Sequence, residues 1–159
     1  PTTGSPPTWG SSAATDEFAG VRTPRSWNQR DALIGGVAWT QNPWQLSANL
    51  NWHDGWRRSE IAAIPDSLEP DGVSLSLAPR NASTWENYFS LDLRTTWSIP
   101  VRWGSLRFYG EINNVTNRGN DCCEAVSLLH SPGMAAQLQR RQSGSLPRYA
   151  LVGLSWSLP

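Results

Sequence analysis

The chain has 159 residues, 13 basic and 13 acidic, so its formal net charge is zero. Zero net charge argues against a nucleic-acid-binding surface, which needs a basic stripe. The sequence contains no recognisable signal peptide and no apolar run of about eighteen residues, so it offers no candidate for a hydrophobic transmembrane helix. The ten Trp residues are the feature in which the composition departs most from that of an ordinary domain. A membrane-interface belt, a sugar-binding surface or an aromatic core would each explain them.

The N-terminal stretch predicts a loop over residues 1–28. It is rich in Pro, Thr, Ser and Gly, and its apolar residues follow neither the period of a strand nor that of a helix. Because the chain lacks an initiating Met and starts in a turn-rich segment, we expect it to be a piece of a longer protein.

Two strands are expected next, over about 30–40 and 44–54, joined by a short turn. The second alternates without interruption between polar residues and an apolar set: Trp44, Leu46, Ala48, Leu50 and Trp52. Trp44 and Trp52 are eight residues apart, which is about 26 Å along an extended strand. The apolar band of a membrane barrel is about 25 Å tall and is flanked by aromatic girdles, so the two indoles fit its edges.

A second hairpin is expected from strands over about 88–99 and 105–115, and a last strand over about 148–158. Each strand alternates with a period of two, and in the two strands of the hairpin full charges stand in mid-strand on the polar side. Between these elements lie two long loops, 55–87 and 116–147. Short turns on one side of a sheet and long loops on the other are typical of outer-membrane barrels.

The expected fold is therefore an all-β, antiparallel transmembrane β-barrel segment. Strands of about ten residues match the length that a bilayer requires. The alternative is a soluble sandwich, in which a second sheet covers the apolar face.

The charged residues of the second hairpin predict a mixed-charge patch. Asp92, Arg94, Arg107 and Glu111 should face one side of that hairpin. In a barrel this patch lines the lumen, where it contacts a plug or a ligand path, or only keeps the interior wet. His53 beside Asp54 suggests a general base, but no nucleophile accompanies it, so a polar residue at the rim is the favoured interpretation.

The first long loop offers candidate ligand contacts, and the second offers a cysteine pair. Trp56, Arg57 and Arg58, with Trp85, would stack on and pair with an anionic or sugar ligand, although such residues are equally common without one. Cys122 and Cys123 are adjacent. They leave three alternatives open: a strained vicinal disulfide, free or intermolecular thiols, or metal ligands that need further partners.

Several segments, taken in order, resemble the TonB-dependent outer-membrane receptors of Gram-negative bacteria. The segments are PRSWNQRDAL at 24–33, PWQLSANLNWHDGW at 43–56, FYGEINNVTNR at 108–118, NDCCE at 120–124 and LPRYALVGLSWSLP at 146–159. The last one also resembles the C-terminal signal read by the barrel-assembly machinery, through Gly153, Trp156 and Leu158. It departs from that signal in ending with Pro159, where an aromatic residue is usual.

The resemblance implies that residues 1–159 form about the last five strands of a 22-stranded type of barrel in the cell outer membrane. It also implies active uptake of a scarce ligand such as a ferric siderophore, cobalamin or an oligosaccharide. The implied partners are the TonB complex, a plug domain, the assembly machinery and outer-membrane lipid. Neither the plug nor the TonB-contacting segment is in this sequence.

The expected function is therefore transport, without catalytic residues, a cofactor or a metal. The main rival is a soluble all-β Trp-rich carbohydrate-binding module. A barrel enzyme is disfavoured because no Ser/His/Asp or paired-carboxylate constellation stands out.

Overall fold

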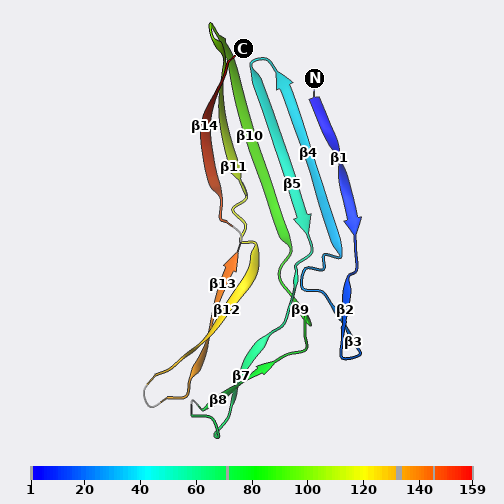
Figure 1. The fold of residues 1–159 in the computed structure, drawn as a ribbon, viewed down its shortest axis with the longest axis vertical. Coiled ribbons are helices and arrows are strands. Elements are labelled where there is room, and N and C mark those ends of the chain that lie inside the picture. Colours follow the sequence, from blue (N-terminus) through cyan, green and yellow to red (C-terminus); the bar gives the residue numbers. More distant parts are fainter. Residues whose placement is uncertain (1, 71, 132–133, 145, 159) are drawn as a thin grey trace.

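The computed structural model describes residues 2–70, 72–131, 134–144 and 146–158 (Figure 1). Within these ranges the chain is all-β, every pairing is antiparallel, and no helix is formed. Alternating side chains and frequent β-branched and aromatic residues explain the strands, since both suit a pleated surface.

Six long strands form the main sheet, in the order β1-β4-β5-β10-β11-β14. Their bounds are β1 (Thr2–Ser11), β4 (Asp31–Gln41), β5 (Trp44–His53), β10 (Tyr88–Val101), β11 (Gly104–Asn113) and β14 (Tyr149–Ser157). The last five stand where the alternation predicts strands. Neighbours in the sheet follow one another in the chain, as in an up-and-down meander.

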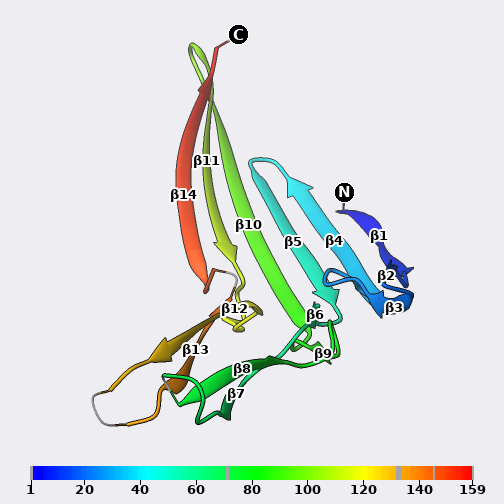
Figure 2. The same cartoon turned by 60° about the horizontal axis from the view of Figure 1, so that its bottom comes forward.

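Four smaller two-stranded ribbons emerge from the main sheet. They pair β2 (Thr15–Phe18) with β3 (Val21–Pro24), β6 (Arg57–Arg58) with β9 (Ser83–Thr84), β7 (Ile61–Pro65) with β8 (Val73–Leu77), and β12 (Asp121–Leu129) with β13 (Gln137–Gly144). All four lie beyond the same end of the sheet, where they project away from it (Figure 2). The short turns at 42–43 and 102–103 lie at the opposite end, together with the C-terminus (Figure 1).

The prediction of a loop over residues 1–28 is wrong. β1 pairs with β4 along the edge of the main sheet, and β2 and β3 form a hairpin. Pro6 and Pro7 break the alternation of β1, and the register shifts between Ser5 and Thr8 to accommodate them. An edge strand tolerates proline at a bulge because its outward N–H groups need no partner in the sheet.

The two long loops are also more ordered than the sequence indicates. Segment 55–87 carries two ribbons, and segment 116–147 carries a third. Pairs of short strands within one loop satisfy backbone groups locally, so neither segment has to be structureless. With β1, the sheet has six strands where five are expected. Within the described residues β14 pairs only with β11 and β1 only with β4, so the sheet keeps two open edges.

An asparagine completes the sheet where β11 is too short. β10 pairs with β11 only from Leu93 onward, which leaves one edge of its first residues open. Asn120 fills this edge like a strand residue, because its side chain accepts from the Phe89 N–H and donates to the Phe89 carbonyl, both at 2.9 Å. The Val115 N–H continues the ladder by donating to the Leu91 carbonyl at 2.8 Å. Asn120 is only 4% exposed, so water does not replace these bonds.

Replacing Asn120 by Ala should lower the free energy of unfolding by about 1–3 kcal/mol, because it leaves the Phe89 backbone groups unpaired in a buried place. Urea unfolding of the folded protein measures the change. Gln142→Ala, at an exposed position of β13, is the matched control and should have no effect. Equal stability of the two variants would show that the Asn120 side chain does not complete the sheet.

Candidate functional site

One face of the main sheet is predominantly apolar over β4, β5, β10, β11 and β14, and we call it the apolar face. The register places side chains from neighbouring strands in rows across the sheet. The middle row contains Val37, Ala48, Leu93, Ile112 and Ala150. The row on its short-turn side contains Trp39, Leu46, Thr95, Gly110 and Val152.

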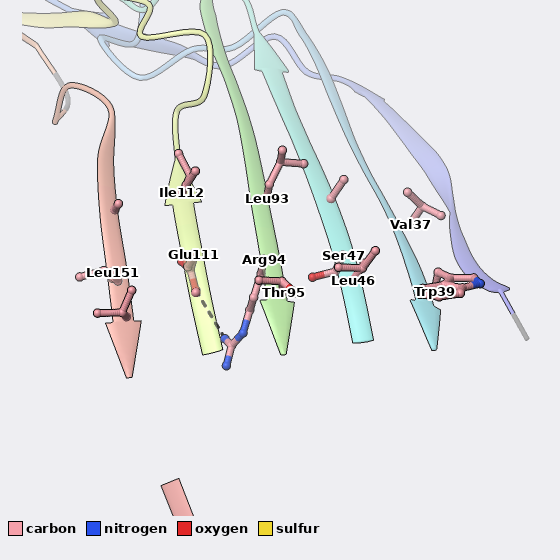
Figure 3. A pocket seen from close by; sticks show the side chains of 14 residues that line it. Val37, Trp39, Leu46, Ser47, Leu93, Arg94, Thr95, Glu111, Ile112 and Leu151 are labelled. Carbon is pink, nitrogen blue, oxygen red and sulfur yellow. Dashed lines mark ion pairs between the residues drawn. The ribbon is translucent and has the colours of Figure 1, made fainter. Parts of the chain in front are cut away.

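Nothing in the described chain covers this face. Val152 is 87% exposed and Leu93 is 40% exposed, and the only buried hydrophobic residue among those described is Ala136. Residues of these two rows line a shallow cavity of about 600 Å³ (Figure 3). A soluble domain rarely leaves so large an apolar surface exposed, so the face requires another apolar environment.

Stacked aromatic rings mark both ends of the apolar face. At the ribbon end, Trp9 stacks on Trp52 with ring centroids 6.4 Å apart. At the short-turn end, Trp97 stands between Trp44, at 5.8 Å, and Phe108, at 5.6 Å. The aromatic residues that bracket single strands in the sequence therefore form rows that cross several strands.

The opposite, polar face carries the predicted charged patch. Asp92, Arg94, Arg107 and Glu111 all share this face by register. Arg94 lies 3.5 Å from the Glu111 carboxylate in an ion pair (Figure 3) and stands over the Tyr109 ring at 5.0 Å. Asp92 is engaged differently, since it accepts hydrogen bonds from the Ser90 hydroxyl and from the Asn114 N–H. The patch is therefore one ion pair beside a separate hydrogen-bonded carboxylate.

Gly153, expected as part of an assembly signal, has a structural role on the polar face. It lies opposite Tyr109, and a Cβ atom at this position would overlap the tyrosine ring. Tyr109 thus covers the backbone of the glycine while its ring supports Arg94, an arrangement known to protect sheet glycines. No local pattern in the sequence points to Tyr109, because its pairing with Gly153 depends on the register of β11 with β14. Trp156 and Leu158, the other two signal positions, are 60% and 68% exposed.

His53 is a structural residue of the rim. Its ring stacks on Tyr88 at 4.7 Å and on Trp56 at 5.5 Å, and its Nδ1 donates to the Asp54 carbonyl at 2.6 Å. Only 8% of His53 is exposed. Held between two aromatic rings, His53 anchors the start of the first long loop to the end of the sheet.

The expected ligand contacts of the first loop mostly engage one another. Arg58 stands over the Trp85 ring at 4.3 Å, and Trp56 is occupied by His53. The Trp56 Nε1 and Arg58 Nε atoms are buried without a hydrogen-bond partner. Arg57 differs from its neighbours, because no hydrogen bond or ion pair engages its guanidinium among the described residues.

The cysteine pair lies at the base of the β12–β13 ribbon. Cys122 and Cys123 are free thiols with sulfur atoms 2.7 Å apart, and Cys122 Sγ also lies 3.7 Å from the Ser143 carbonyl oxygen. The hydrogen bond to Cys123, together with desolvation, raises the pKa of the Cys122 thiol above its ordinary value. The vicinal disulfide stays a prediction. Among the described residues no group of three or more potential metal ligands occurs.

Alkylation of the reduced protein should be slow at Cys122 near neutral pH, because the thiolate is the nucleophile and a raised pKa keeps it scarce. The rate at Cys122 should climb with pH beyond the range in which an unperturbed peptide thiol levels off. Timed iodoacetamide labelling with peptide mass spectrometry, in the Cys123→Ser variant and in the native pair, measures both rates. If the native pair and the single thiol have the same pH profile, Cys123 does not influence Cys122.

No family model, curated protein or solved structure matches this chain. No helix among the described residues is long and apolar enough to span a membrane.

Proposed function

We propose that this chain is the C-terminal part of the β-barrel of a TonB-dependent outer-membrane receptor. In this proposal the apolar face contacts lipid and the polar face lines the lumen, with Arg94 and Glu111 inside. The ribbons form extracellular loops, and the short turns face the periplasm. The complete protein takes up a scarce ligand, such as a ferric siderophore, cobalamin or an oligosaccharide, with energy supplied through TonB.

The observation that carries the proposal is the uncovered apolar face. It runs over the five strands β4, β5, β10, β11 and β14, and nothing else in the described chain buries it. A bilayer satisfies such a face, because alternate residues of a barrel strand turn to lipid and to the wet interior. The two aromatic rows support the same interpretation, since indole rings prefer the membrane–water interface.

The open edges of β1 and β14 support a larger assembly. Each edge presents unpaired backbone groups, which a bilayer does not tolerate. Further strands of the same protein would pair with both edges and close the barrel. The reading frame upstream of Pro1 should therefore encode many more alternating strands, preceded by a plug-like domain and a signal peptide.

Uptake by starved cells tests the transport function. Deleting the gene should abolish uptake of one ligand among a panel of ferric siderophores, cobalamin and oligosaccharides, and a strain without TonB should lose the same uptake. Unchanged uptake of the whole panel would remove the support for a receptor.

A soluble Trp-rich carbohydrate-binding module is the second candidate, because exposed indoles such as Trp9 and Trp156 could stack on sugars. It predicts that the protein stays in solution without detergent and binds oligosaccharides through these rings. Flotation with liposomes separates the two candidates, since only a membrane-embedded protein floats after an alkaline wash.

A further inference from the structure

A polar cavity of about 320 Å³ lies where the first loop leaves the main sheet. It is lined by Asn28, Arg30, Asp54, Gly55, Arg57, Thr84 and Asn87, which come from three separate segments of the chain. None of these residues takes part in the apolar rows or in the charged patch of the polar face. Of these residues only Arg57 is predicted from the sequence to contact a ligand, because the other lining residues come close to it only in the fold.

The position of this cavity follows from the register. Leu33, Trp52 and Phe89 share the apolar face in one row. Continuing the alternation by two residues beyond this row brings Asp31, Asp54 and Asn87 to the same side. The Asp54 N–H donates to the Asp31 carbonyl at 3.0 Å, so the row is maintained there. Asp54 and Asn87, two of the seven residues that line the cavity, therefore lie on the apolar side of the sheet, about 7 Å beyond the aromatic row of Trp9 and Trp52.

The cavity presents hydrogen-bond donors. The Asn28 side-chain oxygen accepts from the Ala14 N–H at 2.8 Å, and the Asn87 side-chain oxygen accepts from the Gly55 N–H at 3.3 Å. Since both oxygens are occupied, each amide leaves its NH₂ group for a ligand. The Arg57 guanidinium is unengaged among the described residues.

Two arginines line the cavity, and only Arg30 forms ion pairs among the described residues. Arg30 is shared between two carboxylates, at 3.1 Å from Asp31 and 3.8 Å from Asp54. Arg30 is engaged by these two carboxylates, whereas Arg57 forms no ion pair with any described residue. A planar guanidinium beside two amide donors suits an oxyanion, above all a phosphate, which accepts several hydrogen bonds at once.

We propose that this cavity binds the phosphate of an outer-leaflet lipid head group. The inference rests on the proposed membrane location, because that location places the cavity at the head-group level, just outside an aromatic row. A lipid bound there would extend its acyl chains along the apolar face, so phosphate and chains would be recognised together. This arrangement distinguishes the site from one for free phosphate, which would gain nothing from the apolar surface.

Titration of the purified complete protein with lipid A, followed by native mass spectrometry, tests the proposal. Diphosphorylated lipid A should bind, and Arg57→Gln should weaken binding roughly tenfold through loss of a charge-assisted contact. Asn87→Asp should weaken it similarly, because the acceptor for Gly55 is kept while the donor becomes a repelling charge. Arg22→Gln is the control, since Arg22 pairs with Glu17 in the β2–β3 ribbon and does not line the cavity.

Two further ligands identify the source of the phosphate. Dephosphorylated lipid A should bind the native protein as weakly as lipid A binds Arg57→Gln, and inorganic phosphate at equal concentration should not displace the lipid. Native-like binding by both variants, full binding of the dephosphorylated lipid, or displacement by inorganic phosphate would each overturn the proposal. If the protein floats with liposomes in any of these cases, the membrane location stands and only the lipid site fails. If it does not float, the proposed function fails as well.

Discussion

Ala48→Arg should destabilise the protein in a bilayer by about 2–4 kcal/mol, the cost of a cationic side chain at the lipid-facing midplane of a barrel. Ala48 stands in the middle row of the apolar face, four residues from both Trp44 and Trp52. At about 3.3 Å per residue it is about 13 Å along the strand from each aromatic row, far from the head groups. Urea unfolding in lipid vesicles, followed by Trp fluorescence, measures the effect.

Asn49→Arg is the matched control, because it introduces the same side chain one residue further along the strand, on the polar face. Its cross-strand neighbour is Asp92, which favours a cation. The control should change stability by less than about 0.5 kcal/mol. If both variants behave alike, the two faces meet the same solvent, and the apolar face does not contact lipid.

Gly104→Ala should destabilise the sheet by about 2–6 kcal/mol, since backbone strain and steric overlap act together. Gly104 is the first residue of β11 and has a φ of 126°, a conformation that residues with a side chain avoid. A Cβ atom there would also overlap the Ser157 carbonyl oxygen of β14. Because that oxygen belongs to backbone, the end of β14 would have to move away. The loss should appear as a lower folded yield and a lower urea midpoint.

Gly119→Ala provides the control for this substitution. Gly119 has no positive φ, and a Cβ atom added there meets no other atom within 4 Å. Its replacement should alter stability by less than about 0.5 kcal/mol. A Gly104→Ala variant as stable as Gly119→Ala would mean that the second hairpin does not have the described geometry.

Alternation in the sequence predicts most of the main sheet because β5, β10 and β11 each have one apolar and one polar face, and β4 and β14 each keep one apolar face. A period of two places Trp44, Trp52 and Trp97 on one face without knowledge of the fold. The sequence does not predict β1, because Pro6 and Pro7 interrupt the strand alternation. A shift of register between Ser5 and Thr8 allows β1 to pair with β4 on both sides of the prolines. The sequence does not predict the ribbons either, because most of their strands are short and each pairs within its own loop. Local turns, rather than burial of an apolar face, determine where these strands form.

The functional surfaces are less predictable because they depend on register. The charged residues of one hairpin are assigned correctly to one face, yet the Arg94–Glu111 pair and the cover of Tyr109 over Gly153 require the pairing of β11 with both neighbours. The cavity around Arg57 depends on three segments up to about sixty residues apart, which no local pattern connects. Contacts of this kind become visible only when the strands are aligned.

Accessibility of spin labels along β10 tests the central claim most directly. Single cysteines replace residues 91–99, one at a time, in the membrane-embedded protein in which Cys122 and Cys123 are changed to Ser. We predict that labels at odd positions, such as Leu93 and Trp97, collide mainly with oxygen dissolved in lipid. Labels at even positions should collide mainly with a water-soluble nickel chelate. Equal access of the nickel chelate to both sets, or low access of both reagents at the odd positions, would contradict a lipid-facing sheet.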